Sequence, residues 1–146
     1  MIVIASDHAG VDLKTWLVEL IGEAGHEIRD LGPADTSSVD YPDFAHAVAR
    51  ALTTGEAERG ILICGTGIGM SISANRHPGV RAALCHDAFT AEMARRHNDA
   101  NVLCMGARVL GVSVAEQITR IFLDSEFEGG RHQRRVEKIE IEREES

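Results

Sequence analysis

The sequence predicts a doubly wound α/β fold, in which helices cover both faces of a parallel β-sheet. Short apolar runs alternate along the chain with longer segments whose apolar residues recur at helical spacing. The runs are continuous, as is typical of strands that are buried on both faces of a sheet. Parallel strands joined by right-handed helical crossovers account for both features. We therefore expect a three-layer α/β/α, Rossmann-like fold with a five-stranded parallel sheet.

The first part of the chain contains three of the expected strands. Residues 1–5 are predicted to form a buried strand, and residues 27–31 a weaker one. The helix between them has its apolar face over residues 13–24, and Gly25 is suited to end it. Pro42 suits the first turn of a helix that continues to about residue 52. The third strand is expected at residues 61–64, and a glycine turn joins it to a short helix over 68–75.

The second part contains the remaining strands. The fourth is expected at residues 80–85 and the fifth at 101–105, with a helix between them that ends near His97-Asn98. A further helix is predicted near residues 114–122, and Gly129-Gly130 interrupt the helical pattern. The last segment, over about residues 131–146, mixes Glu and Arg densely. It predicts a charged helix that extends to a partner subunit or lies exposed.

Length and composition limit the class of protein. The chain has 146 residues and 44% hydrophobic content, which predicts one domain over residues 1–146. Its net charge of −8 argues against a nucleic-acid surface. No apolar run approaches the roughly 20 residues of a membrane span, and no basic segment precedes the first apolar run as in a signal peptide. The three separated cysteines do not suggest a disulfide framework, so we expect a cytoplasmic protein.

Polar or flexible residues follow the strands at the ends where ligands bind in such sheets. These segments are Ser6-Asp7-His8, Cys64-Gly65-Thr66-Gly67, Cys85-His86-Asp87 and Gly106-Ala107-Arg108. The carboxyl ends of parallel strands share one edge of the sheet. We therefore expect the functional site at this edge.

Gly65, Gly67 and Gly69 form a glycine turn that fits none of the common phosphate-binding motifs. A dinucleotide-binding turn needs a glycine where this chain has Met70, and a Walker A loop needs a Lys that is absent. A cysteine phosphatase loop would need an Arg at the position of Met70. Successive backbone N–H groups could still hold a phosphate, or an oxygen that becomes negative during a reaction. A tight turn without any ligand is the third possibility.

Cys64 precedes the glycine turn and has two possible roles. It is either a buried core residue or a general base, because a nearby helix N-terminus favours the thiolate form. Cys85 and Cys104 are expected to be core residues. A zinc site made of the three cysteines and His86 is disfavoured, because none of them forms a C-x-x-C or H-x-x-x-H pair. No metal is therefore expected.

Three further groups of polar residues have both functional and ordinary interpretations. Arg131 and Arg135 lie four residues apart on one helical face, which suits a phosphate dianion but also suits ion pairs with nearby glutamates. Asp7-His8 could cap a helix or bind a sugar hydroxyl and a phosphate. His97-Asn98 could simply end a helix.

Several blocks, in this order along the chain, carry a resemblance to a known family. They are Ser6-Asp7-His8-Ala9-Gly10, Asp40-Tyr41-Pro42, residues 64–69, Ala74-Asn75, residues 96–101, Gly106-Ala107-Arg108 and residues 129–136. Together they resemble the ribose-5-phosphate isomerase B family, which includes allose- and galactose-6-phosphate isomerases. The resemblance covers nearly the whole chain.

The resemblance implies an aldose–ketose isomerase that works without a metal or an organic cofactor. Such an enzyme moves a proton between neighbouring carbons of a ring-opened sugar phosphate through a cis-enediolate. Ribose 5-phosphate and ribulose 5-phosphate are the expected substrates. A six-carbon sugar phosphate isomerase and a non-catalytic module that senses a sugar phosphate remain alternatives.

The resemblance also implies roles for individual residues. Cys64 matches the proton-abstracting cysteine, and the chain has no glutamate at Met70 or Ser71, where a second branch of the family places its base. The residues that match the anion hole are Gly65, Thr66, Gly67, Ile68 and Gly69, with Thr66 adding a hydroxyl. His97 matches the residue that opens the sugar ring.

The remaining matches concern the substrate and a second subunit. Those matching contacts to substrate hydroxyls and phosphate are Asp7, His8, Asn98, Arg108, Arg131 and Arg135. Family members are homodimers or homotetramers whose pockets are completed by a neighbouring subunit. Some of His97, Asn98 and Arg108 are therefore expected to act in trans.

Overall fold

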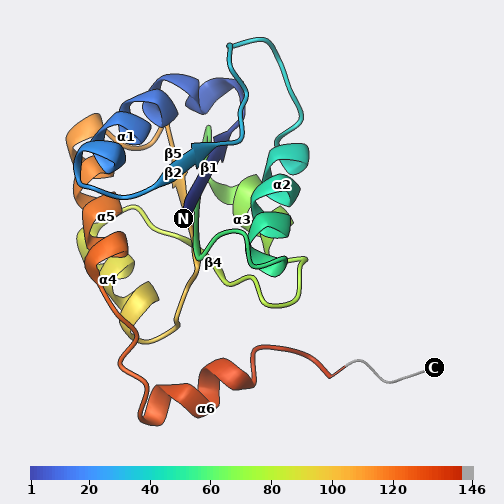
Figure 1. Cartoon of the computed structure of the whole chain (residues 1–146), viewed down its shortest axis with the longest axis vertical. Helices are drawn as coiled ribbons and strands as arrows, with labels where there is room; N and C mark the ends of the chain where they lie inside the picture. Colours follow the sequence, from blue (N-terminus) through green and yellow to red (C-terminus); the bar gives the residue numbers. More distant parts are fainter. Residues whose placement is uncertain (143–146) are drawn as a thin grey trace.

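A computed structural model, which describes residues 1–142, confirms the five-stranded parallel sheet (Figure 1). The strands are β1 (Ile2–Ser6), β2 (Ile28–Asp30), β3 (Arg59–Cys64), β4 (Ala82–Leu84) and β5 (Val102–Gly106). Their order in the sheet is β2-β1-β3-β5-β4, and all four pairings are parallel. The apolar runs of the sequence thus became strands, although β2 and β4 have only three residues each.

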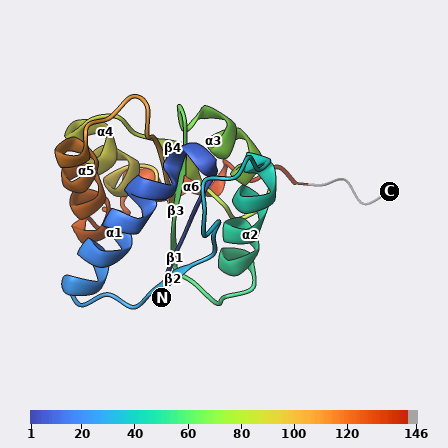
Figure 2. The ribbon, with the colours of Figure 1, turned by 90° about the horizontal axis from the view of Figure 1, so that it is seen from above.

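Helices cover both faces of the sheet. They are η1 (His8–Gly10), α1 (Val11–Glu23), α2 (Tyr41–Thr53), α3 (Ile68–Ala74), α4 (Ala88–Arg96), α5 (Val112–Asp124) and α6 (Arg131–Glu137). Figure 2 shows α1, α4 and α5 on one side of the strands and α2 and α3 on the other. The predicted three-layer arrangement is confirmed.

The two faces of the sheet bury separate apolar clusters. Ile4 of β1 packs with Leu17 and the helices α4 and α5, whereas Val3 packs with Val48 of α2 on the opposite face. Successive strand residues point to opposite faces, so a strand buried on both faces needs apolar residues at every position. This is why the strands appear in the sequence as continuous apolar runs.

The strand order, which the sequence left open, determines where a ligand can bind. The crossover after β1 leads outward to β2, and the crossover after β3 leads the other way to β4. The neighbouring strands β1 and β3 therefore have connections that diverge, and sheets of this kind are expected to have a ligand crevice at that point, outside the carboxyl ends of the strands. Asp7 follows β1 and Cys64 ends β3, so both lie at this crevice.

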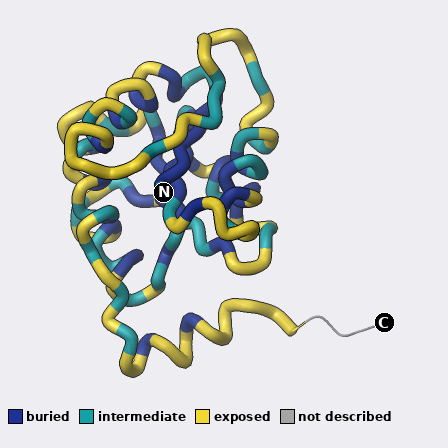
Figure 3. The backbone as a smooth tube through the Cα atoms, viewed as in Figure 1, coloured by how far each residue is buried: buried dark blue, intermediate teal, exposed yellow. Residues whose placement is uncertain are grey.

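Helix α6 is shorter than the predicted charged segment. It ends at Glu137, residues 138–142 have no regular helix, and residues 143–146 lie outside the described part of the chain. His132 and Val136 are buried, whereas the arginines of α6 are exposed (Figure 3). In Figure 1 this helix lies apart from the helices that flank the sheet. Within residues 1–142, none of the helices is long and apolar enough to span a membrane.

Candidate active site

The glycine turn after β3 is packed directly against the backbone that follows β5. Gly67 has φ +78°, and a Cβ there would lie 2.8 Å from the carbonyl carbon of Met105. A Cβ on Gly106 would lie 2.8 Å from the backbone of Thr66. Neither distance can accommodate a side chain, so the two segments touch through their main chains. The glycine pattern thus has a structural cause at Gly67, whether or not the turn binds a ligand.

Cys64 lies at the start of this turn and is 5% exposed. Its Sγ accepts a hydrogen bond from the N–H of Gly67 at 3.1 Å. A donor directed at sulfur stabilises negative charge there, as a base that cycles between thiolate and thiol requires. The sequence left open whether Cys64 is a core or a functional residue. The position at the ligand-binding edge, with a backbone donor, favours function.

Several N–H groups of the turn are available to an anion. The N–H of Ile68 donates to Oγ1 of Thr66 at 3.3 Å, and that of Gly67 donates to Cys64. The N–H groups of Gly65, Thr66 and Gly69 have no hydrogen-bond partner within residues 1–142. Neighbouring unpaired donors form a concave site for a negative oxygen. The N–H groups of Gly65, Thr66 and Gly69 are thus free to serve the predicted anion hole, whereas that of Ile68 is already paired.

Arg108 lies beside the glycine turn of its own chain. Its backbone N–H donates to the carbonyl of Gly65 at 3.0 Å. Its guanidinium lies over that glycine, because a Cβ on Gly65 would come within 3.2 Å of Nη1. The adjacency of β3 and β5 brings these residues together. The positive charge of Arg108 thus lies beside the unpaired N–H groups.

Asp7 and His8 lie at the neighbouring strand end. The carboxylate of Asp7 accepts from the N–H of Ala9 at 2.9 Å and caps η1, which was one of its two interpretations. The backbone N–H of Asp7 donates to the carbonyl of Ile63 at 3.0 Å, which fixes Asp7 next to the end of β3. Nδ1 of His8 accepts from the N–H of Val39 at 3.3 Å. Both side chains are held beside the crevice.

The other predicted residues lie at the opposite edge of the sheet. Helix α4 begins after the carboxyl end of β4 and runs back to the amino end of β5, so His97 and Asn98 follow its last residue at the amino edge. Along β3, Gly60 is paired with the first residue of β5, and Cys64 lies four residues further on. At about 3.3 Å per residue, this separates the two edges by roughly 13 Å. One chain therefore cannot bring His97 to Cys64.

Arg131 and Arg135 extend this second group. Both are exposed on α6, and neither forms an ion pair among the described residues. The glutamates considered as their partners are engaged elsewhere, since Glu137 accepts from Gln133 and Glu140 accepts from the N–H of Gly79. Two guanidinium groups four residues apart therefore remain available for an anion.

A hollow of about 610 Å³ also lies at the amino edge. Its wall is formed by residues between Asn75 and Ala83, by Asn98, and by residues 139–141. Cys64 is not in its wall. This hollow is thus associated with Asn98 and not with the thiol.

The turn after His97-Asn98 is stabilised by ion pairs and hydrogen bonds. Asp99 has φ +47°, a left-handed conformation that is costly for a residue with a side chain. Its carboxylate accepts from Arg95 at 2.9 Å and from Arg81 at 3.3 Å. Arg95 is almost fully buried and also donates to the carbonyl of Ala100 at 2.7 Å. These contacts hold the backbone that presents His97 and Asn98.

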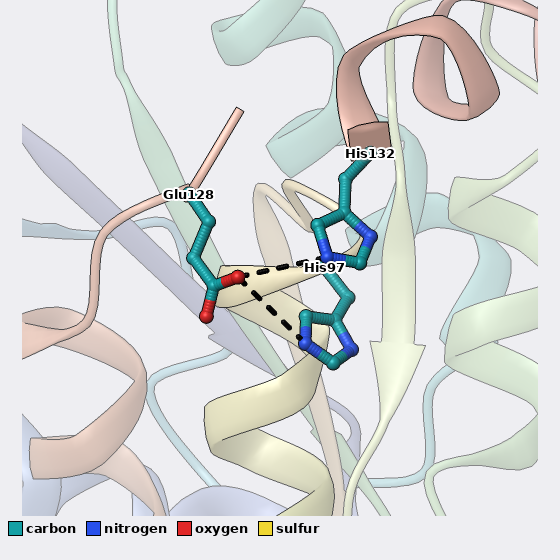
Figure 4. A group of neighbouring side chains, drawn as sticks. All are labelled: His97, Glu128 and His132. Atoms are coloured by element: carbon teal, nitrogen blue, oxygen red, sulfur yellow. Dashed lines mark ion pairs between the residues drawn. The ribbon is translucent and has the colours of Figure 1, made fainter. Parts of the chain in front are cut away.

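Two residues that received no role from the sequence surround His97. Its ring stacks on that of His132 with centroids 4.2 Å apart and planes 14° apart, and Glu128 approaches both rings (Figure 4). The three ligand atoms lie within 4.8 Å of one another, as in a metal site. However, a metal ion lies near the plane of each imidazole that binds it, and two stacked parallel rings do not share a plane. The arrangement fits a shared charge better than a metal ion.

The other two cysteines are unsuited to be bases. Burial raises the pKa of the Cys85 thiol to about 11. Burial also raises the pKa of Cys104, which is fully enclosed between strands and helix. Both are therefore protonated at neutral pH and behave as apolar core residues, as the sequence predicted.

Gly67→Ala should destabilise the protein and lower its activity, because the new Cβ meets backbone at a positive φ. The matched control is Gly55→Ala, where φ is +81° but nothing lies within 4 Å. The conformational cost of about 1–3 kcal/mol applies to both variants, and the collision applies to Gly67 alone. Urea denaturation should show the larger loss for Gly67→Ala. An equal loss in both would contradict the close backbone approach.

Comparisons with known proteins show which proteins the chain resembles in sequence and in fold. A model of the ribose/galactose isomerase family matches residues 2–139. Ribose-5-phosphate isomerase B of Escherichia coli is 47% identical over 133 residues, which cover 91% of this chain and 89% of that protein. The structure of ribose-5-phosphate isomerase B from Clostridium thermocellum has a TM-score of 0.93 and 50% identity, covering 94% and 93% of the two chains. The type B enzyme of Trypanosoma brucei has a TM-score of 0.91 and 50% identity, covering 94% and 95%.

Proposed function

The chain belongs to the ribose/galactose isomerase family, and on this premise we propose that it interconverts ribose 5-phosphate and ribulose 5-phosphate. The observation that carries the proposal is the position of Cys64. Its thiol lies beside unpaired backbone N–H groups and the guanidinium of Arg108, at the crevice between β1 and β3. A base next to an anion hole is what proton transfer through an enediolate requires.

In the proposed reaction, Cys64 acts as a thiolate on the open-chain sugar. Sγ takes the proton from C2 of the aldose, and the electron pair moves to the carbonyl oxygen at C1 to form the cis-enediolate. The N–H groups of Gly65, Thr66 and Gly69 stabilise the negative oxygen. The proton of the C2 hydroxyl passes to the C1 oxygen within the enediolate, and the thiol then returns its proton to C1 as the C2 oxygen becomes a carbonyl. The Thr66 hydroxyl assists at the same oxygens, and no external oxidant or cofactor is consumed.

A second copy of the chain supplies the rest of this site. His97 opens the furanose ring, Asn98 binds sugar hydroxyls, and Arg131 and Arg135 bind the phosphate in this proposal. All four residues lie at the amino edge of the sheet, whereas Cys64 lies at the carboxyl edge. They can therefore approach a Cys64 thiol only if that thiol belongs to another chain across an interface. Arg108 is packed over Gly65 and acts in cis. A two-fold dimer that joins the two edges completes two sites at once.

The surface beside the glycine turn supports such an interface. Ile68, Ile72, Leu84 and Phe89 are large apolar side chains that are exposed in the single chain. Leu84 borders the turn itself, since a Cβ on Gly67 would lie 2.6 Å from its Cδ1. Strand β4 also forms an edge of the sheet. Burial of this patch by a second copy would stabilise a homodimer, or a homotetramer built from it.

The overall charge is compatible with a phosphate substrate. The net charge of −8 repels a dianion at long range. Arg108 of one copy and Arg131 and Arg135 of the other concentrate positive charge where the phosphate would lie. The sugar phosphate is thus selected by a local cluster and not by a basic surface.

The direct test is an isomerase assay of the wild-type protein with metals chelated. Ribose 5-phosphate should be turned over with a kcat/KM about 10-fold or more above those for allose 6-phosphate and galactose 6-phosphate, because the pocket discriminates chain length. A preference for a six-carbon substrate would replace the ribose assignment. Binding without turnover, and without exchange of solvent deuterium into the sugar, would instead identify a sensor.

A further inference from the structure

The cluster around His97 joins three separate segments of the chain. His97 follows α4, Glu128 lies in the connection after α5, and His132 lies in the first turn of α6. Oε2 of Glu128 is 3.6 Å from Nε2 of His132 and 4.0 Å from Nε2 of His97. These distances exceed those of hydrogen bonds but permit a strong charge interaction. Figure 4 shows the carboxylate directed at both rings.

Each member of the cluster is fixed by its backbone. The N–H of Glu128 donates to the carbonyl of Arg96 at 3.0 Å, which ties the connection to the end of α4. Gly129 and Gly130 have φ of +66° and +53° and turn the chain sharply into α6. The N–H of His132 then donates to the carbonyl of Gly129 at 3.0 Å. The stacked pair of rings is therefore a defined feature of the fold.

The two imidazoles of the pair are not equivalent. His132 is buried, whereas a third of the His97 side chain is exposed. Burial lowers the pKa of His132, and the nearby charges of His97 and Arg131 lower it further, although Glu128 opposes them. Two stacked rings cannot both carry a charge cheaply. Glu128 therefore lies where a single positive charge on the pair would be stabilised, and His97 is the more exposed of the two rings.

We propose that Glu128 and His132 are positioning residues for His97. This inference rests on the proposed isomerase function and on His97 as its ring-opening group. The ring of His132 fixes the plane of the His97 imidazole. Glu128 faces Nε2 of His97, which leaves Nδ1 to face the sugar of the second copy and to exchange the proton during ring opening.

The test separates ring opening from proton transfer by the choice of substrate. Ribose 5-phosphate is mostly a closed furanose, whereas ribulose 5-phosphate cannot form a five-membered ring, because its C5 hydroxyl is phosphorylated. Single-turnover conversion, with enzyme in excess and acid quenching, is measured from each sugar. His132→Ala should slow conversion from ribose 5-phosphate by about 10- to 100-fold, because His97 loses its orientation. The rate from ribulose 5-phosphate should remain near that of the wild type.

Three variants distinguish the parts of the proposal. His132→Phe keeps a stacked ring and should retain more ring-opening activity than His132→Ala. Glu128→Gln keeps the size of the side chain but removes its charge, and should slow only the reaction from ribose 5-phosphate. Gln133→Ala, at an exposed neighbour on α6, is the control and should affect neither rate.

The possible failures are distinguishable. If His132→Ala slows both directions equally, its role is to hold α6 and its arginines in place, and the positioning of His97 is refuted. If His132→Ala slows neither direction, the stack has no role in the reaction and the inference is likewise refuted. If the wild-type protein converts neither sugar, the proposed function itself is wrong.

Discussion

Cys64→Ala is expected to reduce the turnover of ribose 5-phosphate by roughly 10³-fold, because the variant has no group to remove the C2 proton. Exchange of solvent deuterium into the sugar should fall with it. Binding of the sugar phosphate should change little, since Arg108, Arg131 and Arg135 remain. Steady-state turnover, deuterium incorporation measured by NMR and calorimetric binding provide the three readouts. Cys64→Ser, which keeps the shape but is a far weaker base at neutral pH, should resemble the alanine variant.

The matched control for this experiment is Cys85→Ala. Cys85 is also a buried cysteine at the carboxyl end of a strand, but its raised pKa keeps it protonated. The control should keep nearly full activity. Retained exchange in Cys64→Ala would exclude the thiol as the base, and parallel losses of binding and folding would show that the residue serves the core.

Two inactive variants should restore activity when they are combined. One carries Cys64→Ala, and the other carries both Arg131→Ala and Arg135→Ala. In a mixed two-fold dimer, one site has both defects and the other has neither. Random reassortment should therefore recover about a quarter of the wild-type activity, because half of the dimers are mixed and each contains one intact site. The variants are unfolded together, refolded and assayed at low substrate concentration.

Two controls accompany the mixing experiment. Mixing Cys64→Ala with the double variant that also carries Cys64→Ala should restore nothing, because every site then lacks the thiol. Refolding each variant alone should likewise leave it inactive. No recovery in the main mixture, with mixed dimers detected by mass spectrometry, would place the arginines and the thiol on the same chain and would contradict the arrangement across an interface.

The fold was largely predictable because burial on both faces leaves a strong pattern. The continuous apolar run at residues 61–64 and the helical spacing before and after it are local signals. The strand order was not predictable in this way. Strand β3 pairs with β5 and not with β4, and the connecting helices α3 and α4 lie on opposite faces of the sheet, an arrangement with no local signal in the sequence.

The site was only partly predictable for a similar reason. Cys64 and the glycine turn are adjacent in the chain, so their chemistry could be recognised from the sequence. The separation of His97 from Cys64 follows from the direction of α4 and became clear only in three dimensions. His132 had no signal that distinguished it from other surface-helix histidines. The available clue was that His132 lies four residues after Glu128. The two glycines between them have positive φ and turn the chain sharply, which brings the two side chains together.

The main-chain contact of Gly67 with the segment around Gly106 has a consequence for how the protein can vary. Where side chains pack, a change on one side can be absorbed by a change on the other. Here the backbone of Met105 faces Gly67, beside the side chain of Leu84, and the backbone of Thr66 faces Gly106. A backbone has the same shape in every sequence. No second substitution can make room for a methyl group at either position. The amide dipoles of the turn therefore keep their direction before any charge develops, and in the proposed reaction the enediolate would meet donors that need no reorganisation.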